Sequence, residues 1–388
     1  MTRNDAVAPR DIAVVIVAHQ SASELPSCLD ALARAAPRSR LSIIGVDNAS
    51  TDGSAEILKA YRALVIRERS NTGFAAAVNK AMRHVTAPMA ILLNPDVIAQ
   101  PEAIDRLADA AESFPQVPAF GGRTLFADGT TNPTNAWAAI TPHSALFTAL
   151  GLSSLRPRSA FFNPEALPDW DRTTNQDVEI ATGCALLVRA DLFRNSDGFN
   201  ERYWLYGEEA EWQNRLRAMG HPPARIVADA VFTHVNGYLA ASNGAGTIRM
   251  SRALRGRATL MRDSWPPIFQ PLVSMILRLH ALRYLAQSFA GGTHGLRHAT
   301  LWRTRHDWIA GYPEPTKVSG AKPRSYRLIR GVAAAFSPRA YVQALRVLNY
   351  HNYMNARPRT VLTRGRDVEI SPKAIFTNAA VFQWAIVL

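Results

Sequence analysis

The chain has 388 residues of ordinary apolar content, enough for one large domain or two medium ones with a sizeable core. It has no run of about 18 apolar residues, and its first 20 residues carry two Asp, so we expect neither a membrane-spanning helix nor a signal peptide. The net charge of +13 is uneven: residues 1–240 hold 22 Lys and Arg against 26 Asp and Glu, whereas residues 241–388 hold 22 against 5. This asymmetry predicts an anionic partner for the C-terminal part, either a phospholipid membrane, a diphosphate-bearing substrate or nucleic acid.

The two cysteines, Cys28 and Cys184, show no sign of pairing. Their use fits a reducing compartment, with both thiols buried as small apolar groups.

Strand and helix patterns alternate four times in the first 113 residues. The predicted strands are residues 12–18, 41–46, 63–66 and 89–93, and the predicted helices start near 23 or cover 55–61, 75–84 and 101–113. Ser23 is expected to cap the first helix, with Pro26 in its first turn. The alternation predicts a parallel α/β sheet with right-handed crossovers, in which ligands bind beyond the carboxyl ends of the strands.

Residues 121–180 look more antiparallel and loop-rich, with turns at 128–129 and 132–133. A strand over 182–189 and a helix follow. An aromatic run at 203–206 then leads into a cluster of three carboxylates, Glu208, Glu209 and Glu211. A carboxylate beside aromatic side chains can sit in a partly desolvated pocket and act as a base. The alternative is a solvated helix start, where acidic residues are favoured.

The pattern changes after about residue 240. A basic helix is predicted over 251–264, and Pro266 and Pro267 end it. Residues 268–289 carry apolar side chains at helical spacing, which fits either a core-facing helix or a helix lying on an anionic bilayer. The apolar positions are Leu272, Met275, Ile276, Leu279, Leu282 and Leu285. We further expect a loop over 311–324, a basic helix pair within 326–354, and a last apolar segment, 374–388, docked as a strand on the core or on another subunit.

Two motifs follow predicted strands at the expected ligand edge. Asp47 opens the first of them, residues 47–54, and a carboxylate there can accept a hydrogen bond from a uracil or thymine ring N–H, while the next helix start favours anions. An ordinary capped turn is the alternative. In residues 71–79, a Gly among small residues permits close backbone approach to a ligand. Neither a Gly-rich dinucleotide fingerprint nor a P-loop is present.

A third motif, Asn94-Pro95-Asp96, follows the strand at 89–93. A carboxylate at that point can hold Mg²⁺ or Mn²⁺, which in turn binds a diphosphate. One Asp needs a second ligand, for which His234 is the candidate, and an N/O ligand pair suits Mn²⁺ somewhat better. The alternative for a lone His is a structural or surface role.

Together these motifs resemble the inverting, GT-A-fold glycosyltransferases of family 2, particularly the rhamnosyltransferase-like branch, over roughly residues 12–240. Four ordered segments carry the resemblance. They are residues 14–21 (VVIVAHQS), residues 47–54 (DNASTDGS), residues 71–79 together with 92–97 (LLNPDV), and residues 182–215 with their TGC, GFNER and YGEE elements.

The resemblance implies an α/β, GT-A-type domain over residues 1–240, with a mostly parallel nucleotide-binding sheet flanked by helices, and a basic, mainly helical region over 241–388. It assigns Glu209 as catalytic base, Asp96 and His234 as metal ligands, and Asp47 as the contact to the nucleotide base. The implied donor-binding residues are Ala18, His19, Asp47, Asn48, Asn71, Gly73, Asn79 and Asn94. Arg215 also matches a family position, although we favour an i,i+4 pair with Glu211.

The chain departs from the family at several points, which include Asn200 in place of an Asp and a shift of the usual Asp pair to Glu209 and Glu211. Ala18-His19-Gln20 replaces a Thr-Tyr-Asn element, although His19 could stack on a base in place of the Tyr, and Glu209 replaces an Asp. A catalytically inactive GT-A-fold binding or assembly protein is therefore the alternative. A nucleotidyltransferase fits less well, because residues 18–23 contain no Gly.

The predicted enzyme is a hexosyltransferase in cell-surface polysaccharide synthesis, dependent on Mn²⁺ or Mg²⁺. Its expected donor is a dTDP- or UDP-linked sugar, with rhamnose suggested by the branch, and its acceptor a glycan or lipid-diphosphate-linked glycan. An anionic membrane surface and a second copy of the chain are further candidate partners, and nucleic acid is not expected. The expected location is cytoplasmic, including the inner face of the membrane.

Overall fold

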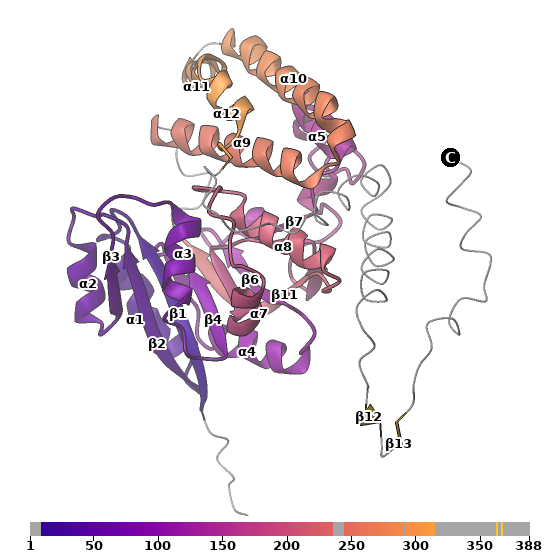
Figure 1. The fold of residues 1–388 in the computed structure, drawn as a ribbon. Helices are drawn as coiled ribbons and strands as arrows, with labels where there is room; N and C mark the ends of the chain where they lie inside the picture. The colour runs from indigo at the N-terminus through magenta and orange to yellow at the C-terminus, as the bar shows by residue number, and fades with distance from the viewer. Residues whose placement is uncertain (1–8, 236–243, 291, 315–361, 364–365, 368–388) are drawn as a thin grey trace, which may run out of the picture.

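The computed structural model describes residues 9–235, 244–290, 292–314, 362–363 and 366–367 (Figure 1). A mixed sheet with helices on both faces forms its larger part. A layer of helices covers one end of that sheet, so that α10 and α11 lie on the far side of α9 from the strands (Figure 1).

The first half of the sheet is parallel, as predicted. Its strands run in the order β3-β2-β1-β4. They are β1 (Arg10–Ala18), β2 (Ser39–Asp47), β3 (Leu64–Arg67) and β4 (Met89–Leu93). The crossover helices are α1 (Leu25–Ala35), α2 (Ser54–Ala60) and α3 (Phe74–Met82), and α4 (Ala103–Ser113) follows β4. Together they confirm the α/β class.

The cap of α1 differs from the prediction. The helix begins after Glu24, and its terminus has no side-chain cap, although Pro26 lies in the first turn as expected. The Ser23 hydroxyl donates instead to the Glu24 carboxylate at 2.6 Å. Ser23 lies one residue too early for its oxygen to reach the free N–H groups of the helix.

The second half of the sheet is mixed rather than simply antiparallel. Strand β10 (Ala185–Arg189) is antiparallel to β4 and to β6 (Ala119–Leu125), whereas β11 (Ala224–His234) is parallel to β6. The short strands β5 (Val97–Ala99) and β8 (Gln176–Val178) pair antiparallel with β11. A separate pair joins β7 (Ala136–Trp137) to β9 (Ile180–Ala181).

The predicted turn at 128–129 is present, since the Phe126 N–H donates to the Thr130 carbonyl. Asn132 instead caps a 3-10 helix, Pro133–Asn135. The same region contains helices that the sequence pattern did not reveal. They are α5 (Pro142–Leu150), α6 (Leu152–Leu155) and a 3-10 turn, Pro164–Ala166.

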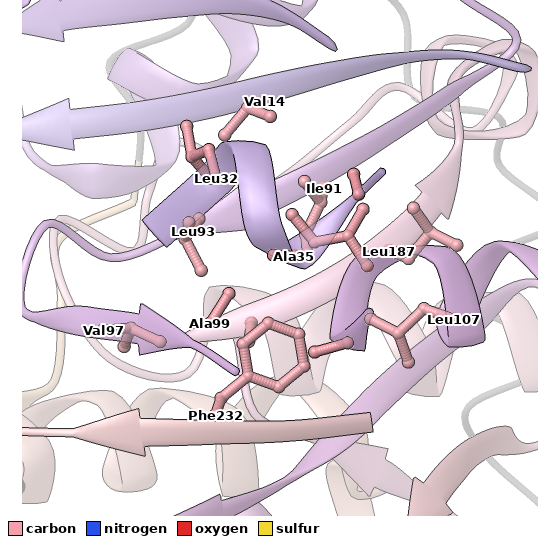
Figure 2. Packing of buried hydrophobic residues seen from close by; sticks show 14 of the residues in the cluster. Val14, Leu32, Ala35, Ile91, Leu93, Val97, Ala99, Leu107, Leu187 and Phe232 are labelled. Carbon is pink, nitrogen blue, oxygen red and sulfur yellow. The ribbon is translucent and has the colours of Figure 1, made fainter. Parts of the chain in front are cut away.

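Two apolar cores lie on opposite faces of the sheet. In the first, side chains of β1, β4 and β10 pack against α1 and α4, and Figure 2 shows Val14, Leu32, Ile91, Leu107 and Phe232 among them. In the second, the other faces of the same strands pack against α3, α7 (Ala190–Asn195) and α8 (Glu208–Ala218). Burial on both faces explains why the parallel strands are apolar throughout.

The helical layer is built from α9 (Gly244–Ser264), a 3-10 turn (Pro267–Phe269), α10 (Gln270–Ser288), α11 (Gly292–Arg303) and α12 (Arg305–Ala310). The basic helix thus begins before residue 251, and Pro266 and Pro267 follow its end as predicted. Helix α5 joins this layer, because Ala145 and Ala149 are buried against side chains of α9 and α10.

Both cysteines are free and buried, as expected. Within the described ranges, the structure contains no helix with the length and apolarity needed to cross a bilayer. The predicted helix pair within 326–354 and the segment 374–388 lie outside the described residues, as does the loop beyond Glu314. The remaining described elements are the short paired strands β12 (Leu362–Thr363) and β13 (Arg366–Asp367).

Candidate functional site

The carboxyl ends of β1 and β2 bring the predicted base-contacting residues together. Ala18 ends β1 directly opposite Asp47, which ends β2. The side chain of Asp47 is buried, and one of its oxygens accepts a 3.0 Å hydrogen bond from the Ser50 N–H. His19 is exposed beside it, and its ring Nδ1 lies 2.9 Å from the Asn48 carbonyl oxygen.

Asn48 joins this edge to the predicted loop at 71–73. Its side-chain nitrogen donates to the Asn71 side chain at 3.1 Å and to the Gly73 carbonyl at 3.2 Å. Its side-chain oxygen accepts from the Thr72 N–H at 2.9 Å. The Asn48 amide is buried, and both its nitrogen and its oxygen are hydrogen-bonded to residues 71–73. It therefore holds this loop in place.

Gly73 brings that loop against the aromatic run. Its φ is +87°, and a Cβ there would lie 2.4 Å from the Trp204 carbonyl oxygen. The same oxygen accepts a 2.8 Å hydrogen bond from the Phe74 N–H. Gly therefore allows a close approach that no other residue permits.

Asn79 faces away from these groups. Its side-chain nitrogen donates to the Phe199 carbonyl at 2.8 Å, and its oxygen accepts from the Phe199 N–H at 2.9 Å. This two-sided contact fixes the turn before the aromatic run. The geometry gives Asn79 a positioning role, and its contact with a donor stays a prediction.

The predicted metal ligands meet at the ends of two strands. Asp96 follows β4, His234 ends β11, and the His234 Nε2 lies 3.2 Å from the Asp96 carboxylate. The Val235 N–H donates to the Asp96 carbonyl at 3.0 Å, which locks the two segments together. Burial lowers the pKa of His234, but hydrogen bonds to Asp96 and Cys184 raise it to about 10.

Asn94 connects this pair to β10. Its backbone N–H donates to the Cys184 carbonyl at 2.9 Å, which places Cys184 beside both Asn94 and His234. No cluster of three or more His, Cys, Asp or Glu with metal-binding geometry occurs in the described part of the chain. Asp96 and His234 therefore offer two protein ligands of the N/O type.

Glu209 lies in the first turn of α8, next to the same small-residue turn. A Cβ on Gly183 would lie 3.8 Å from the Cβ of Glu209, and Gly183 precedes Cys184. The base candidate and the metal pair thus border one short segment. Arg215, further along α8, makes the expected pair with Glu211 at 3.1 Å and also binds the Ser196 and Gly198 carbonyls.

Burial sets the electrostatics of the two carboxyls that open α8. It raises the pKa of Glu209, and backbone hydrogen bonds, one of them from Gly183, oppose the rise. Burial and the neighbouring charge of Glu209 raise the pKa of Glu208 well above its usual value. One oxygen, Oε2, of each carboxyl is buried without a hydrogen-bond partner among the described residues.

Sequence reasoning did not find the groups that hold the aromatic run from the other side. Tyr312 accepts from the Leu205 N–H at 3.3 Å, and Arg252 lies over the Trp204 ring at 4.5 Å. Asp263 binds Arg202 at 2.8 Å and the Tyr203 hydroxyl at 3.0 Å. These partners are 48 to 107 residues apart in the chain, so no local pattern predicts them.

Residues 13–194 match the family model described as glycosyl transferase family 2. The chain is similar to the N-acetylglucosaminyl-diphospho-decaprenol L-rhamnosyltransferase of Mycobacterium tuberculosis, with 28% identity over 235 residues, 57% of this chain and 75% of that protein. It is also similar to the O-antigen biosynthesis protein RfbC of Myxococcus xanthus, with 26% identity over 40% of this chain and 11% of that protein. A mannosyltransferase structure from Pyrobaculum calidifontis, in complex with GDP-Man and Mn²⁺, aligns with a TM-score of 0.45 at 18% identity over 90% of this chain and 89% of that one.

Proposed function

We propose that residues 13–194, which match the family 2 glycosyltransferase model, form such a domain, and that the chain is an inverting hexosyltransferase of cell-surface polysaccharide synthesis. The observation that carries the proposal is the convergence on one segment, Gly183-Cys184, of the Glu209 carboxyl and the Asp96–His234 pair. A base and a diphosphate-binding pair are the two functions that sugar transfer from a nucleotide requires.

The proposed binding site for the donor nucleotide lies at the carboxyl ends of β1 and β2. Asp47 would accept the ring N–H of uracil or thymine, which favours a UDP- or dTDP-linked sugar. His19 is exposed beside it and could stack on the base. Rhamnose is the proposed sugar, because the Mycobacterium tuberculosis relative is a rhamnosyltransferase.

Asp96 and His234 would hold a divalent cation with an incomplete protein ligand set. The cation would have to displace the proton that His234 binds at its raised pKa, so its binding should weaken as pH falls. The N and O donors of the two residues lie 3.2 Å apart, and neither side chain is fully buried. Two protein ligands leave coordination positions for diphosphate oxygens, as Mn²⁺ and Mg²⁺ sites at substrates commonly do. Such a cation would neutralise charge that develops on the leaving diphosphate.

Glu209 would act on the acceptor. Its carboxylate would take the proton of an acceptor hydroxyl, and the hydroxyl oxygen would attack the anomeric carbon. The bond from this carbon to the nucleoside diphosphate breaks on the opposite side, so configuration inverts. Burial raises the Glu209 pKa, which makes the carboxylate a stronger base than an exposed one.

The acceptor is proposed to be a glycan or a lipid-diphosphate-linked glycan, by similarity to the decaprenol-diphosphate enzyme. Such an acceptor is anchored in a bilayer. The proposed location is therefore cytoplasmic, at the inner membrane face, and a homo-oligomer remains an open alternative for the assembly.

The first test is a thermal-shift panel of UDP-, dTDP- and GDP-linked sugars with Mn²⁺, Mg²⁺ or EDTA. A donor at about 100 times its Kd should stabilise the fold by roughly 2.7 kcal/mol. Stabilisation by one donor that EDTA abolishes is the expected result. Donor-induced stabilisation without any transfer would instead favour the alternative, an inactive GT-A-fold binding protein. The observation that motivates this alternative is Glu209, which stands where the resemblance implies an Asp.

The second test is Glu209→Gln, which keeps the shape and removes the base. We expect transfer to fall by roughly 10²–10⁴-fold while the donor-induced thermal shift persists. Glu112→Gln, an exposed Glu in α4, controls for loss of charge. Near wild-type turnover of Glu209→Gln would show that another group is the base.

A further inference from the structure

Helix α10 is apolar on two opposite faces. Its buried side packs into the helical layer and consists of Val273, Ile276, Leu277, His280, Ala281 and Tyr284. Two of the large apolar residues predicted for the core-facing stripe are exposed instead: Met275 at 46% and Leu282 at 52%. A helix with apolar side chains all round is normally buried on all sides, but this one is not.

The exposed apolar residues form one line along the molecule. Ile268 (78% exposed) precedes α10, Met275 and Leu282 lie within it, and Phe289 (81% exposed) follows its last residue. Met275 and Leu282 are seven residues apart within α10, and such positions drift by only about 20° around a helix. Ile268 and Phe289 continue the seven-residue spacing beyond its two ends. We call these four residues the outer stripe. Figure 1 shows α10 at the end of the molecule farthest from the sheet.

The segment of chain that carries the outer stripe contains no carboxylate. Residues 264–306 include five Arg and no Asp or Glu. Arg278, between Met275 and Leu282, is exposed, and so is Arg303 at the end of α11. Leu296, in α11, is a further exposed apolar side chain.

A second patch of the same composition adjoins α10. Leu150, Leu155 and Phe161 are exposed there, together with Arg156 and Arg158. Residues 129–164 also contain no Asp or Glu. The end of α5 touches α10 beside Leu282, because a Cβ on Gly151 would lie 3.2 Å from the Arg283 side chain.

We propose that the outer stripe and this adjoining patch dock the protein on the surface of an anionic lipid bilayer. Apolar side chains would enter the boundary between headgroups and acyl chains, and the flanking Arg would contact lipid phosphates. The proposal rests on the proposed function for its purpose, since it would hold the active site where a lipid-linked acceptor is presented. It does not depend on that function for its physical basis.

Charge favours a bilayer over the two protein partners that could cover the stripe. A second copy would set one carboxylate-free, Arg-bearing face against another, and like charges at an interface oppose association. The rest of this chain is equally basic, since residues 315–388 hold 12 Lys and Arg against 2 Asp and Glu. An anionic partner is complementary to the Arg-bearing stripe and to the basic residues 315–388 alike.

Vesicle co-sedimentation of the full chain tests the proposal. The vesicles are phosphatidylcholine alone or phosphatidylcholine with phosphatidylglycerol, at low and high salt. The variant Leu282→Gln/Phe289→Gln changes only exposed positions, and Leu64→Gln/Met219→Gln changes exposed apolar residues elsewhere as its control. We expect binding to anionic vesicles only, weakened by salt, and at least a tenfold loss for the stripe variant alone.

Three results would overturn it. The first is no binding to anionic vesicles at low salt. The second is equal binding by the stripe and control variants. The third is a stripe variant that dissociates an oligomer or lowers Tm while vesicle binding is unchanged, which would assign the stripe to a second copy or to the rest of the chain. The donor-induced thermal shift should persist in the stripe variant, so failure of docking and failure of the glycosyltransferase proposal are distinguishable.

Discussion

Glu208 and Glu209 are adjacent in sequence but have different electrostatic surroundings. Both carboxyls are buried at the start of α8. Backbone hydrogen bonds, one of them from Gly183, partly offset burial at Glu209, whereas burial and its neighbour's charge act together on Glu208. When two close carboxyls cannot both ionise, the less stabilised one keeps its proton. We therefore expect Glu209 to ionise first, and Glu208 to keep its proton to a higher pH than Glu209 does.

Glu208→Gln should thus preserve transfer and raise stability near neutral pH. Glu208 binds its proton more tightly in the folded state, so wild-type stability from this group falls as pH rises above the unfolded pKa and towards the raised one. The Gln variant lacks that loss. The difference in Tm between variant and wild type should grow from pH 4 to pH 8. A constant difference would mean that the Glu208 pKa is not raised.

At the scale of elements, residues 200–207 are held between two parts of the chain. The Phe74 N–H, at the start of α3, binds the Trp204 carbonyl from one side. Helix α9 approaches from the other, where a Cβ on Gly256 would lie 2.0 Å from the Tyr206 carbonyl oxygen. Since Glu209 follows directly, both contacts fix the direction in which α8 starts.

Gly73→Ala tests the first of these contacts. Gly73 and Gly129 both have positive φ, but a Cβ on Gly129 would meet nothing within 4 Å. Gly129→Ala should cost about 1–2 kcal/mol, the backbone strain alone. Gly73→Ala should cost more for two reasons: its φ of 87° and ψ of 169° are open essentially to Gly alone, and the Trp204 segment must move. The rate of transfer by the protein that remains folded should also fall. Urea unfolding and turnover measure both effects, and equal costs for the two variants would contradict the contact.

Local sequence patterns predicted the strands and helices whose own residues show a clear apolar pattern. Buried strands such as β1 and β4 are apolar runs. The polar residues that follow them lie at the carboxyl-end edge of the sheet, because parallel strands all end at that edge. The sequence pattern could not predict which face of α10 is buried, because apolar residues recur at helical spacing on both faces. Contacts such as those of Tyr312 with Leu205 depend on packing between distant segments, which spacing does not encode.

At the scale of the whole molecule, the helical layer is packed into the catalytic half. Tyr203 and Ile180, which precede residue 240, are buried against Leu260 and Tyr312, which follow it. Ion pairs cross the same boundary: Arg257 binds Glu165 at 2.6 Å and Asp263 binds Arg202 at 2.8 Å. Apolar packing and ion pairs therefore both cross the domain boundary predicted at residue 240.

We expect a fragment of residues 1–240 to be far less stable than one of residues 1–314. Each large apolar side chain uncovered by the cut costs about 1.5–3 kcal/mol, and a whole domain is stable by only about 5–15 kcal/mol. The shorter fragment should bind hydrophobic dyes and lose the donor-induced thermal shift. The longer one should keep both the cooperative unfolding and the shift of the full chain. Equal urea midpoints for the two fragments would instead show that residues 241–314 are a separate docking module, because the site would then be complete without them.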